Sequence, residues 1–222
     1  SVQIESLMNS AIQKAPKTFS RVLVISLLVL VMIPSIEYSA VAPQGSTAFL
    51  WLKLLIILPL LFAVFVLMVS PLLMIFRTFR ASAVHTFFTA AIFTFATIVA
   101  LVLAAPIRMH AFEDLAERSE PLVTAIHAYE TKNGVPPPNL ASLVPEFLST
   151  VPPTGMAAYP EYQYFVGEKA ASYEGNPWVL YIFTPAGGIN FDSFMYFPRQ
   201  NYPDHGYGGS LERVADWVYV HE

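Results

Sequence analysis

The chain has 222 residues, of which 55% are hydrophobic, and a mean hydropathy of +0.52. Soluble domains are about 45–50% apolar, so part of this chain is expected to have lipid as its solvent. Residues 1–107 hold six basic and two acidic side chains (net +4), and residues 108–222 hold six basic and 14 acidic ones (net −8). This split predicts a membrane part followed by an acidic, water-facing part, and it disfavours nucleic-acid binding. The lack of cysteine excludes disulfides, thiolate catalysis and cysteine-ligated metals.

Residues 1–20 carry apolar side chains at helical spacing, with polar residues opposite them. The apolar positions are Ile4, Leu7, Met8, Ala11 and Ile12. This pattern predicts a short amphipathic helix on the cytoplasmic face of the membrane; a frayed tail is the alternative.

Three apolar runs follow, at residues 21–39, 48–76 and 86–105. A membrane-spanning helix needs about 20 apolar residues, so residues 21–107 are predicted to form a three-helix anchor. The second run is longer than a span requires, and Pro59 and Pro71 are the expected kink sites.

Basic residues gather at two places beside these runs. They are Lys14, Lys17 and Arg21 before the first, and Arg77 and Arg80 after the second. The loop at residues 40–47 has no charge. The positive-inside rule therefore predicts a multi-pass protein of the bacterial inner (cytoplasmic) membrane. Its N-terminus would be cytoplasmic and its C-terminal domain periplasmic or extracellular.

Few polar residues lie within the spans. Lys53, beside Trp51, is expected to extend to the membrane interface as an anchor, and Glu37 is also expected to be interfacial. Small residues repeat every fourth position on the third span, at Ala96, Ala100 and Ala104. Such a stripe allows another helix to approach closely, and the sequence leaves open whether that helix is internal or belongs to another subunit.

Residues 108–222 predict an α+β domain that begins with an amphipathic helix ending at Asn133-Gly134. Pro121 is expected either to kink this helix or to start a new one capped by Ser119. Asn139 is expected to cap a short helix with inward-facing apolar residues, namely Leu140, Leu143 and Val144.

Four short runs rich in β-branched and aromatic residues predict strands at 162–166, 178–183, 193–197 and 217–220. Gly, Pro and Asn mark the separators at 167–177, 185–191 and 198–215. A long helix packed on a small antiparallel sheet is the simplest arrangement that buries these aromatics.

One stretch carries a resemblance to a known family. The run from Leu122 to Pro136 contains Ala125-Ile126, Tyr129 and Asn133-Gly134-Val135-Pro136, and it is followed by residues 139–148 and Pro152-Pro153. It resembles the helix end and following loop of type II secretion pseudopilins and type IV pilins. The resemblance covers roughly residues 115–153, and it implies a long helix followed by a β-sheet.

The chain departs from that family at its N-terminus. Mature pilins carry a glutamate at the position of Glu5, but Asn9, Gln13, Lys14 and Lys17 interrupt the run that is apolar in pilins. With three spans, the chain does not fit an ordinary filament subunit. It is similar to a pilin-type domain on a polytopic anchor.

Residues with catalytic or metal-binding potential do not form a recognisable constellation. The sequence has no nucleophile-elbow, zincin, Walker or dinucleotide motif, so we predict no enzyme activity, no cofactor and no metal. Some pseudopilins bind calcium in a C-terminal loop, but the acids of this region have no ladder-like spacing, so we interpret them as solvated loop acids; they are Asp192, Asp204, Glu212 and Asp216. The five histidines are scattered, and the glycine clusters at 187–188 and 206–209 are interpreted as turns.

These features favour a non-catalytic accessory or scaffold subunit of a larger membrane complex, such as a photosynthetic, respiratory or secretion assembly. Its expected partners are membrane lipids, other integral membrane subunits and an extracytoplasmic protein. A type II secretion or pilus component is one alternative. The other is a membrane-anchored sensor with a ligand pocket among the domain's aromatics, which core packing would equally explain; these are Tyr162, Tyr164, Trp178, Tyr181, Tyr196 and Trp217.

Overall fold

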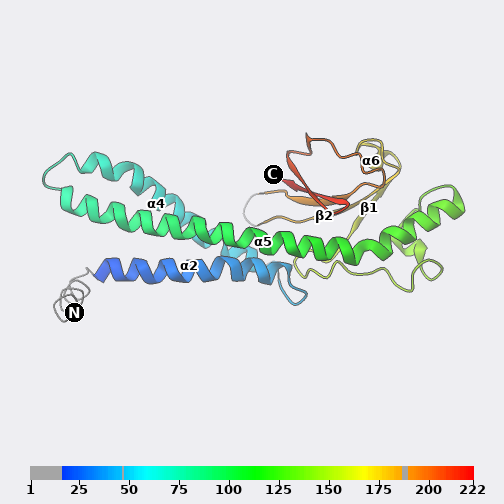
Figure 1. Ribbon diagram of the computed structural model, residues 1–222, viewed down its shortest axis with the longest axis horizontal. Helices are drawn as coiled ribbons and strands as arrows, with labels where there is room; N and C mark the ends of the chain where they lie inside the picture. Colours follow the sequence, from blue (N-terminus) through cyan, green and yellow to red (C-terminus); the bar gives the residue numbers. More distant parts are fainter. Residues whose placement is uncertain (1–16, 47, 187–189) are drawn as a thin grey trace, which may run out of the picture. The chain divides into compact units, whose positions relative to one another are not determined.

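The computed structural model describes residues 17–46, 48–186 and 190–222 (Figure 1). The helix expected over residues 4–12 therefore lies outside the described residues. Contacts divide the described chain into two compact units. The first comprises the residues up to Ser35 together with Leu54–Ala104, and the second comprises Ile36–Lys53 and Ala105–Glu222. Helices α2 (Lys17–Val41) and α5 (Arg80–Asn133) contribute to both units.

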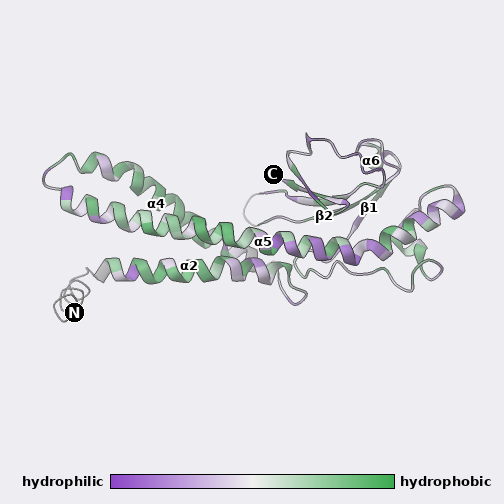
Figure 2. Ribbon diagram, viewed as in Figure 1, coloured by the Kyte–Doolittle hydropathy of each residue, from purple (hydrophilic) through white to green (hydrophobic). Residues whose placement is uncertain are grey.

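Three helices of the described chain are long and apolar enough to cross a membrane. They are α2, α4 (Leu54–Leu73) and α5, with candidate spans Phe19–Val41, Leu55–Leu73 and Arg80–Asn133. Figure 2 shows α4 and the first part of α5 as predominantly hydrophobic, whereas the later part of α5 alternates in hydropathy. The structure thus agrees with the predicted helical anchor of a multi-pass membrane protein.

The second apolar run is divided into two helices. A short helix, α3 (Ala48–Leu52), ends before Lys53, and α4 begins directly after it. The sequence did not predict this break at Lys53. Pro59 and Pro71, the expected kink sites, both lie inside α4.

The small-residue stripe of the third span packs inside the first unit. Ala100 is fully buried and Ala104 is 5% exposed, and both pack with Val29 and Ile33 of α2. Ala96 is also buried. Because an alanine adds little bulk, α2 and α5 come close together at this point. The partner of Ala100 and Ala104 is therefore an internal helix.

Ala100→Leu should weaken the packing of α2 on α5 by about 1–3 kcal/mol, because the added atoms overfill a closed contact. Unfolding by a denaturing detergent, followed by far-UV circular dichroism, measures this loss. Ala105→Leu is the matched control, since Ala105 lies five positions later on the same helix and is exposed. Equal stability of the two variants would contradict the close packing at Ala100.

Helix α5 continues through Pro121, where the sequence predicts either a kink or the start of a new helix. Pro106 and Pro121 both lie inside its 54 residues. Ser119 does not cap a new helix, because its hydroxyl donates to the Leu115 carbonyl oxygen at 2.6 Å. The prediction of a helix start at Pro121 is therefore wrong. A continuous apolar face stabilises the helix here despite its missing donors; it comprises Phe112, Leu115, Leu122 and Ile126, all fully buried.

The end of α5 agrees with the predicted stop. Gly134 has φ +74°, and its N–H donates to the Glu130 carbonyl oxygen at 2.8 Å. Only a residue without Cβ adopts this left-handed geometry at little cost. Asn139 caps a short 3₁₀ helix, η1 (Leu140–Leu143), through Ser142 N–H. Leu143 is buried as predicted, but Val144 is 38% exposed, so its predicted inward position is wrong.

The remaining chain forms a six-stranded antiparallel sheet in the order β1-β2-β3-β6-β5-β4. The strands are β1 (Gln163–Val166), β2 (Trp178–Phe183), β3 (Ser193–Tyr196), β4 (His205–Gly206), β5 (Gly209–Val214) and β6 (Trp217–His221). A short helix, α6 (Glu168–Ala171), follows β1. The four predicted strands are confirmed to within one residue at each end.

Strands β4 and β5 lie in a segment that was predicted to be a separator. They form a hairpin with a two-residue turn at Tyr207-Gly208, whose φ angles are 56° and 89°. Two positive φ values match the right-handed twist of the flanking strands. The glycine cluster at 206–209 therefore contains a turn, as interpreted, and the cluster at 187–188 lies outside the described residues. Strands β4 and β5 were not predicted because turn residues dominate the composition of this segment.

The sheet buries side chains on both faces. Along β2, Trp178, Leu180 and Ile182 belong to the cluster that also contains the buried face of α5, whereas Val179 belongs to the opposite cluster. Figure 1 shows the second half of α5 running alongside the strands. Phe112 of α5 stacks on Phe194 at 4.7 Å between ring centroids, and Phe194 stacks on Trp217 at 4.9 Å. This aromatic stack fixes α5 on the sheet.

Candidate functional site

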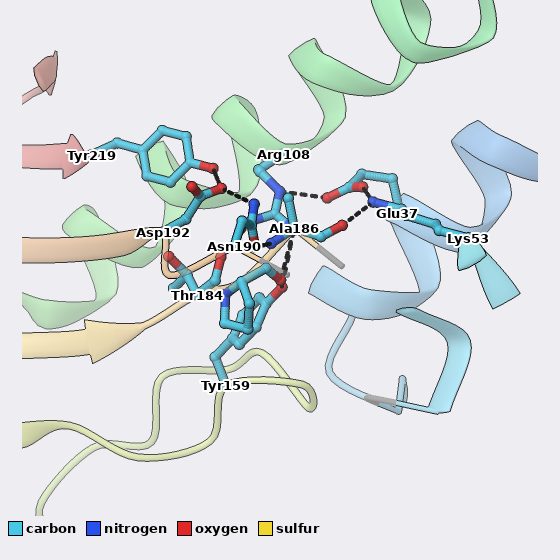
Figure 3. A network of polar contacts seen from close by, with 10 residues as sticks. Glu37, Lys53, Arg108, Tyr159, Thr184, Ala186, Asn190, Asp192 and Tyr219 are labelled. Carbon is cyan, nitrogen blue, oxygen red and sulfur yellow. Dashed lines mark hydrogen bonds and ion pairs between the residues drawn. The ribbon is translucent and has the colours of Figure 1, made fainter. Parts of the chain in front are cut away.

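The most concentrated polar chemistry of the described chain lies in the second unit, where helix ends meet the β2–β3 connection (Figure 3). Glu37 comes from the last turns of α2, Lys53 from the interruption between α3 and α4, and Arg108 from α5. Glu37 and Arg108 are only 3% and 5% exposed. We refer to these three residues, with Tyr159, Asp192 and Tyr219, as the Glu37–Arg108 network.

Arg108 is the centre of the network. Its Nε donates to Glu37 Oε1 at 2.5 Å, and one terminal nitrogen donates to the Thr184 carbonyl oxygen at 2.7 Å. The other terminal nitrogen donates to the Tyr159 hydroxyl at 2.9 Å. The planar guanidinium presents donors in fixed directions, so a single side chain joins α2, the β2–β3 connection and the loop that carries Tyr159.

Lys53 completes the neutralisation of Glu37. Its ammonium pairs with the second Glu37 carboxylate oxygen and donates to the Ala186 carbonyl oxygen at 2.6 Å. The Lys53 side chain is 14% exposed. Its predicted role was an interfacial anchor that extends toward the headgroups; the structure shows an internal ion pair that the sequence did not suggest. Each oxygen of the buried carboxylate thus has a cationic donor.

On the sheet side, Asp192 is held by three donors. The Tyr219 hydroxyl donates to Oδ2 at 2.6 Å, Asn190 Nδ2 donates to the same oxygen at 2.9 Å, and Glu222 N–H donates to Oδ1 at 2.9 Å. Burial raises the pKa of Tyr219, and the hydrogen bond that its hydroxyl donates to Asp192 raises this pKa further. The phenol therefore stays neutral at physiological pH and remains a donor. Asp192 is 4% exposed, so its interpretation as a solvated loop acid is wrong.

The charges of the network balance, with two cations and two carboxylates. Buried ions are costly unless paired and hydrogen-bonded, and here Arg108, Glu37 and Asp192 all have several partners. Such a closed network holds elements together, because its polar atoms are already occupied by one another.

A cleft of about 540 Å³ lies elsewhere in the second unit. Its lining includes the apolar residues Val41, Pro43 and Ile107 and the charged residues Asp114 and Arg118. This volume is within the range of small-molecule sites. The arrangement suits a molecule with an apolar body and a charged group, but the Arg118 side chain is exposed and already donates to the Thr154 carbonyl oxygen at 3.2 Å.

The aromatics proposed from sequence as a ligand pocket pack largely within the core. Trp178 and Tyr196 stack at 5.5 Å between centroids, and Tyr196 contacts Trp217 at 5.4 Å. All three are at most 7% exposed. Tyr181 packs on the opposite face of the sheet. This distribution over two faces agrees with the core interpretation.

The other residues singled out from the sequence take no part in the contacts of the network. Trp51 is 66% exposed, and Arg21, Arg77 and Arg80 are exposed. Lys17 begins α2, and Lys14 lies outside the described residues. Among residues 17–46, 48–186 and 190–222, no three His, Asp or Glu side chains converge as a metal site would require.

Sequence reasoning missed Arg108, Tyr159 and Asp192 as site residues. The sequence did contain an indication for Arg108. It is the first charged residue after the third apolar run, and Glu37 lies near the end of the first apolar run. Opposite charges at adjacent span ends favour a pair. No comparable signal identified Tyr159 or Asp192, which enter the network only through the fold.

Comparisons with protein-family models, curated proteins and solved structures found no match. The geometry of the chain itself is therefore the basis of the functional conclusion.

Proposed function

We propose that this chain is a non-catalytic accessory or scaffold subunit of a larger membrane complex. The Glu37–Arg108 network is the observation that carries the proposal. It joins the ends of membrane-type helices to the β2–β3 connection through buried ion pairs. A joint of this kind holds a water-facing domain in a fixed relation to the helix ends next to it, which is what a scaffold requires.

The membrane helices supply surface for lateral contacts. Ala100 and Ala104 are already covered by α2, so other side chains must meet lipids or neighbouring subunits. Exposed large side chains recur on α4 every three or four positions, at Leu55, Leu58, Phe62, Phe65, Met68 and Leu72. This row forms one face of the helix. It suits a lipid or a transmembrane helix of another subunit, while the sheet domain would contact an extracytoplasmic protein.

Affinity purification of the tagged full-length chain from its native membrane, in a mild detergent, tests the proposal. We expect a fixed set of membrane proteins to co-purify, as identified by mass spectrometry. Phe62→Ala with Phe65→Ala should reduce that set if α4 is the docking face. Phe95→Ala is the matched control, because it removes a phenylalanine of α5 that is 69% exposed and lies outside α4. Recovery of the chain without any partner in several mild detergents would contradict the proposal.

A second candidate, a type II secretion or pilus-related component, is supported by α5 and the sheet. The helix begins with an apolar part, continues as an amphipathic part on an antiparallel sheet, and ends at Asn133-Gly134. This order is similar to that of a pilin-type domain. The candidate predicts a secretion or piliation defect in a deletion strain. Normal secretion and normal pili in that strain would remove it.

The orientation remains part of the proposal. Basic residues at Arg21, Arg77 and Arg80 favour a cytoplasmic N-terminus and α4–α5 connection in a bacterial inner membrane, with the sheet domain outside. Because the chain has no cysteine, a single introduced cysteine at Val135 reports the side of the sheet domain. Reaction with an impermeant thiol reagent in whole spheroplasts is expected, and protection until lysis would reverse the assignment.

A further inference from the structure

Four large aromatic side chains of the second unit are exposed near the Glu37–Arg108 network. Tyr38 follows Glu37 in α2 and is 65% exposed, and Trp51 of α3 lies two residues before Lys53 and is 66% exposed. Phe183 and Phe191, at the two ends of the β2–β3 connection, are 40% and 61% exposed. Exposed aromatic residues in such a group are unusual on a surface that meets only water.

Hydrogen bonds hold the β2–β3 connection against the helix ends. Arg108 binds the Thr184 carbonyl oxygen at 2.7 Å, and Lys53 binds the Ala186 carbonyl oxygen at 2.6 Å. Thr184 N–H donates to the Asp192 carbonyl oxygen at 2.8 Å, which brings the two ends of the connection together. The rings of Phe183 and Phe191 accordingly lie 6.3 Å apart. The pair is therefore fixed beside Arg108 and Lys53.

The ends of the candidate spans indicate the depth at which Phe183 and Phe191 lie relative to a membrane. Glu37 lies four residues before Val41, where the first candidate span ends, and Lys53 lies two residues before Leu55, where the second begins. At 1.5 Å per residue, both are within about 6 Å of a span end. Groups bound to Glu37 and Lys53 are therefore expected at the depth of the lipid headgroups.

The sequence of the connection also fits a lipid surface. Residues 183–191 include no charged side chain, although residues 108–222 carry a net charge of −8. An uncharged aromatic edge on an otherwise acidic domain avoids repulsion from anionic headgroups. Aromatic rings are enriched at this depth in membrane proteins.

We infer that the Phe183–Phe191 edge of the sheet domain inserts into the interface of the same bilayer that holds the helices, at the level of Trp51 and Tyr38. The sheet domain then lies against the membrane surface at its β2–β3 end. The partner of this edge is the lipid itself, at the boundary between headgroups and acyl chains.

Site-directed spin labelling tests the inference, because the chain contains no cysteine. Phe191→Cys is labelled with a nitroxide, and the full-length chain is reconstituted into vesicles of phosphatidylcholine and phosphatidylglycerol. Val135→Cys is the matched control. Val135 is 59% exposed and follows the end of α5, about 38 Å along the helix from Arg108 at 1.5 Å per residue.

The label at position 191 should relax faster with oxygen, which partitions into lipid, than with a water-soluble nickel chelate. The label at position 135 should show the reverse. Phe183→Cys is the second variant, measured in the same way, and far-UV circular dichroism verifies that each variant is folded. The inference is overturned if the labels at 191 and 183 respond like the label at 135. It is equally overturned if they are shielded from both reagents, since no other protein is present to cover them.

Discussion

Replacing Arg108 by alanine should lower the free energy of unfolding by about 3–5 kcal/mol, the cost expected when one partner of a buried ion pair is removed. The substitution leaves Glu37 with Lys53 as its remaining cation. It also removes the donor from the Thr184 carbonyl oxygen and from the Tyr159 hydroxyl. Burial of unpaired acceptors adds to the loss. For a chain of this length the melting midpoint should fall by about 10 °C.

Thermal unfolding in mild detergent, followed by tryptophan fluorescence, measures this change because Trp178 and Trp217 lie in the core of the same unit. Arg118→Ala is the matched control. Arg118 is on the same helix, is exposed and makes one hydrogen bond to the Thr154 carbonyl oxygen, so its loss should remain below about 1 kcal/mol. Arg108→Lys should fall between the two, since it keeps the charge but not the planar donors. Equal midpoints for Arg108→Ala and Arg118→Ala would show that the network does not stabilise the unit.

Phe112→Ala should cost about 3–5 kcal/mol, because it removes a buried ring and leaves a cavity. Phe112 is fully buried, stacks on Phe194 and also contacts Tyr219 at 4.8 Å between centroids. It is the main aromatic contact between α5 and the central strands. Loss of this ring should therefore release the helix from the sheet as well as lower the midpoint. Near-UV circular dichroism of the stacked aromatics measures that release.

Two further substitutions serve as comparisons for the stability loss of Phe112→Ala. Phe112→Leu retains most of the volume and should cost less than half as much as Phe112→Ala. Phe183→Ala removes a phenylalanine that is 40% exposed, so it should change stability by at most about 1 kcal/mol. A Phe112→Ala protein that keeps the wild-type midpoint and near-UV spectrum would contradict the packing of α5 on the sheet.

Local patterns in the sequence predicted those parts of the fold that depend on near neighbours. Hydropathy located the three membrane-type helices, and β-branched and aromatic runs located four strands. The Gly134 stop agrees for the same reason, since a helix C-terminus depends on residues within one turn. Strands β4 and β5 were missed because turn residues join them and β5 carries polar side chains, so their composition resembles that of a loop.

The candidate site was less accessible from sequence. Glu37 and Arg108 are separated by 71 positions. The carbonyl group of Thr184 lies 76 positions after Arg108, and that of Ala186 lies 133 positions after Lys53. No periodicity or spacing rule relates such residues. Lys53 also has the local environment of an interfacial anchor, with Trp51 nearby, and only the fold brings Glu37 to it. Pro121 illustrates the same point, because α5 packs on the sheet on both sides of it and continues, although its local sequence also suited the start of a new helix.

The mass of the native particle tests the proposed role most directly. The full-length chain, extracted from its own membrane in a mild detergent, would be examined by native mass spectrometry. An accessory subunit predicts a particle of fixed composition that is several times heavier than the 24.6 kDa chain and contains other membrane proteins. A particle of 24.6 kDa, or one built only from copies of this chain, would contradict the scaffold role.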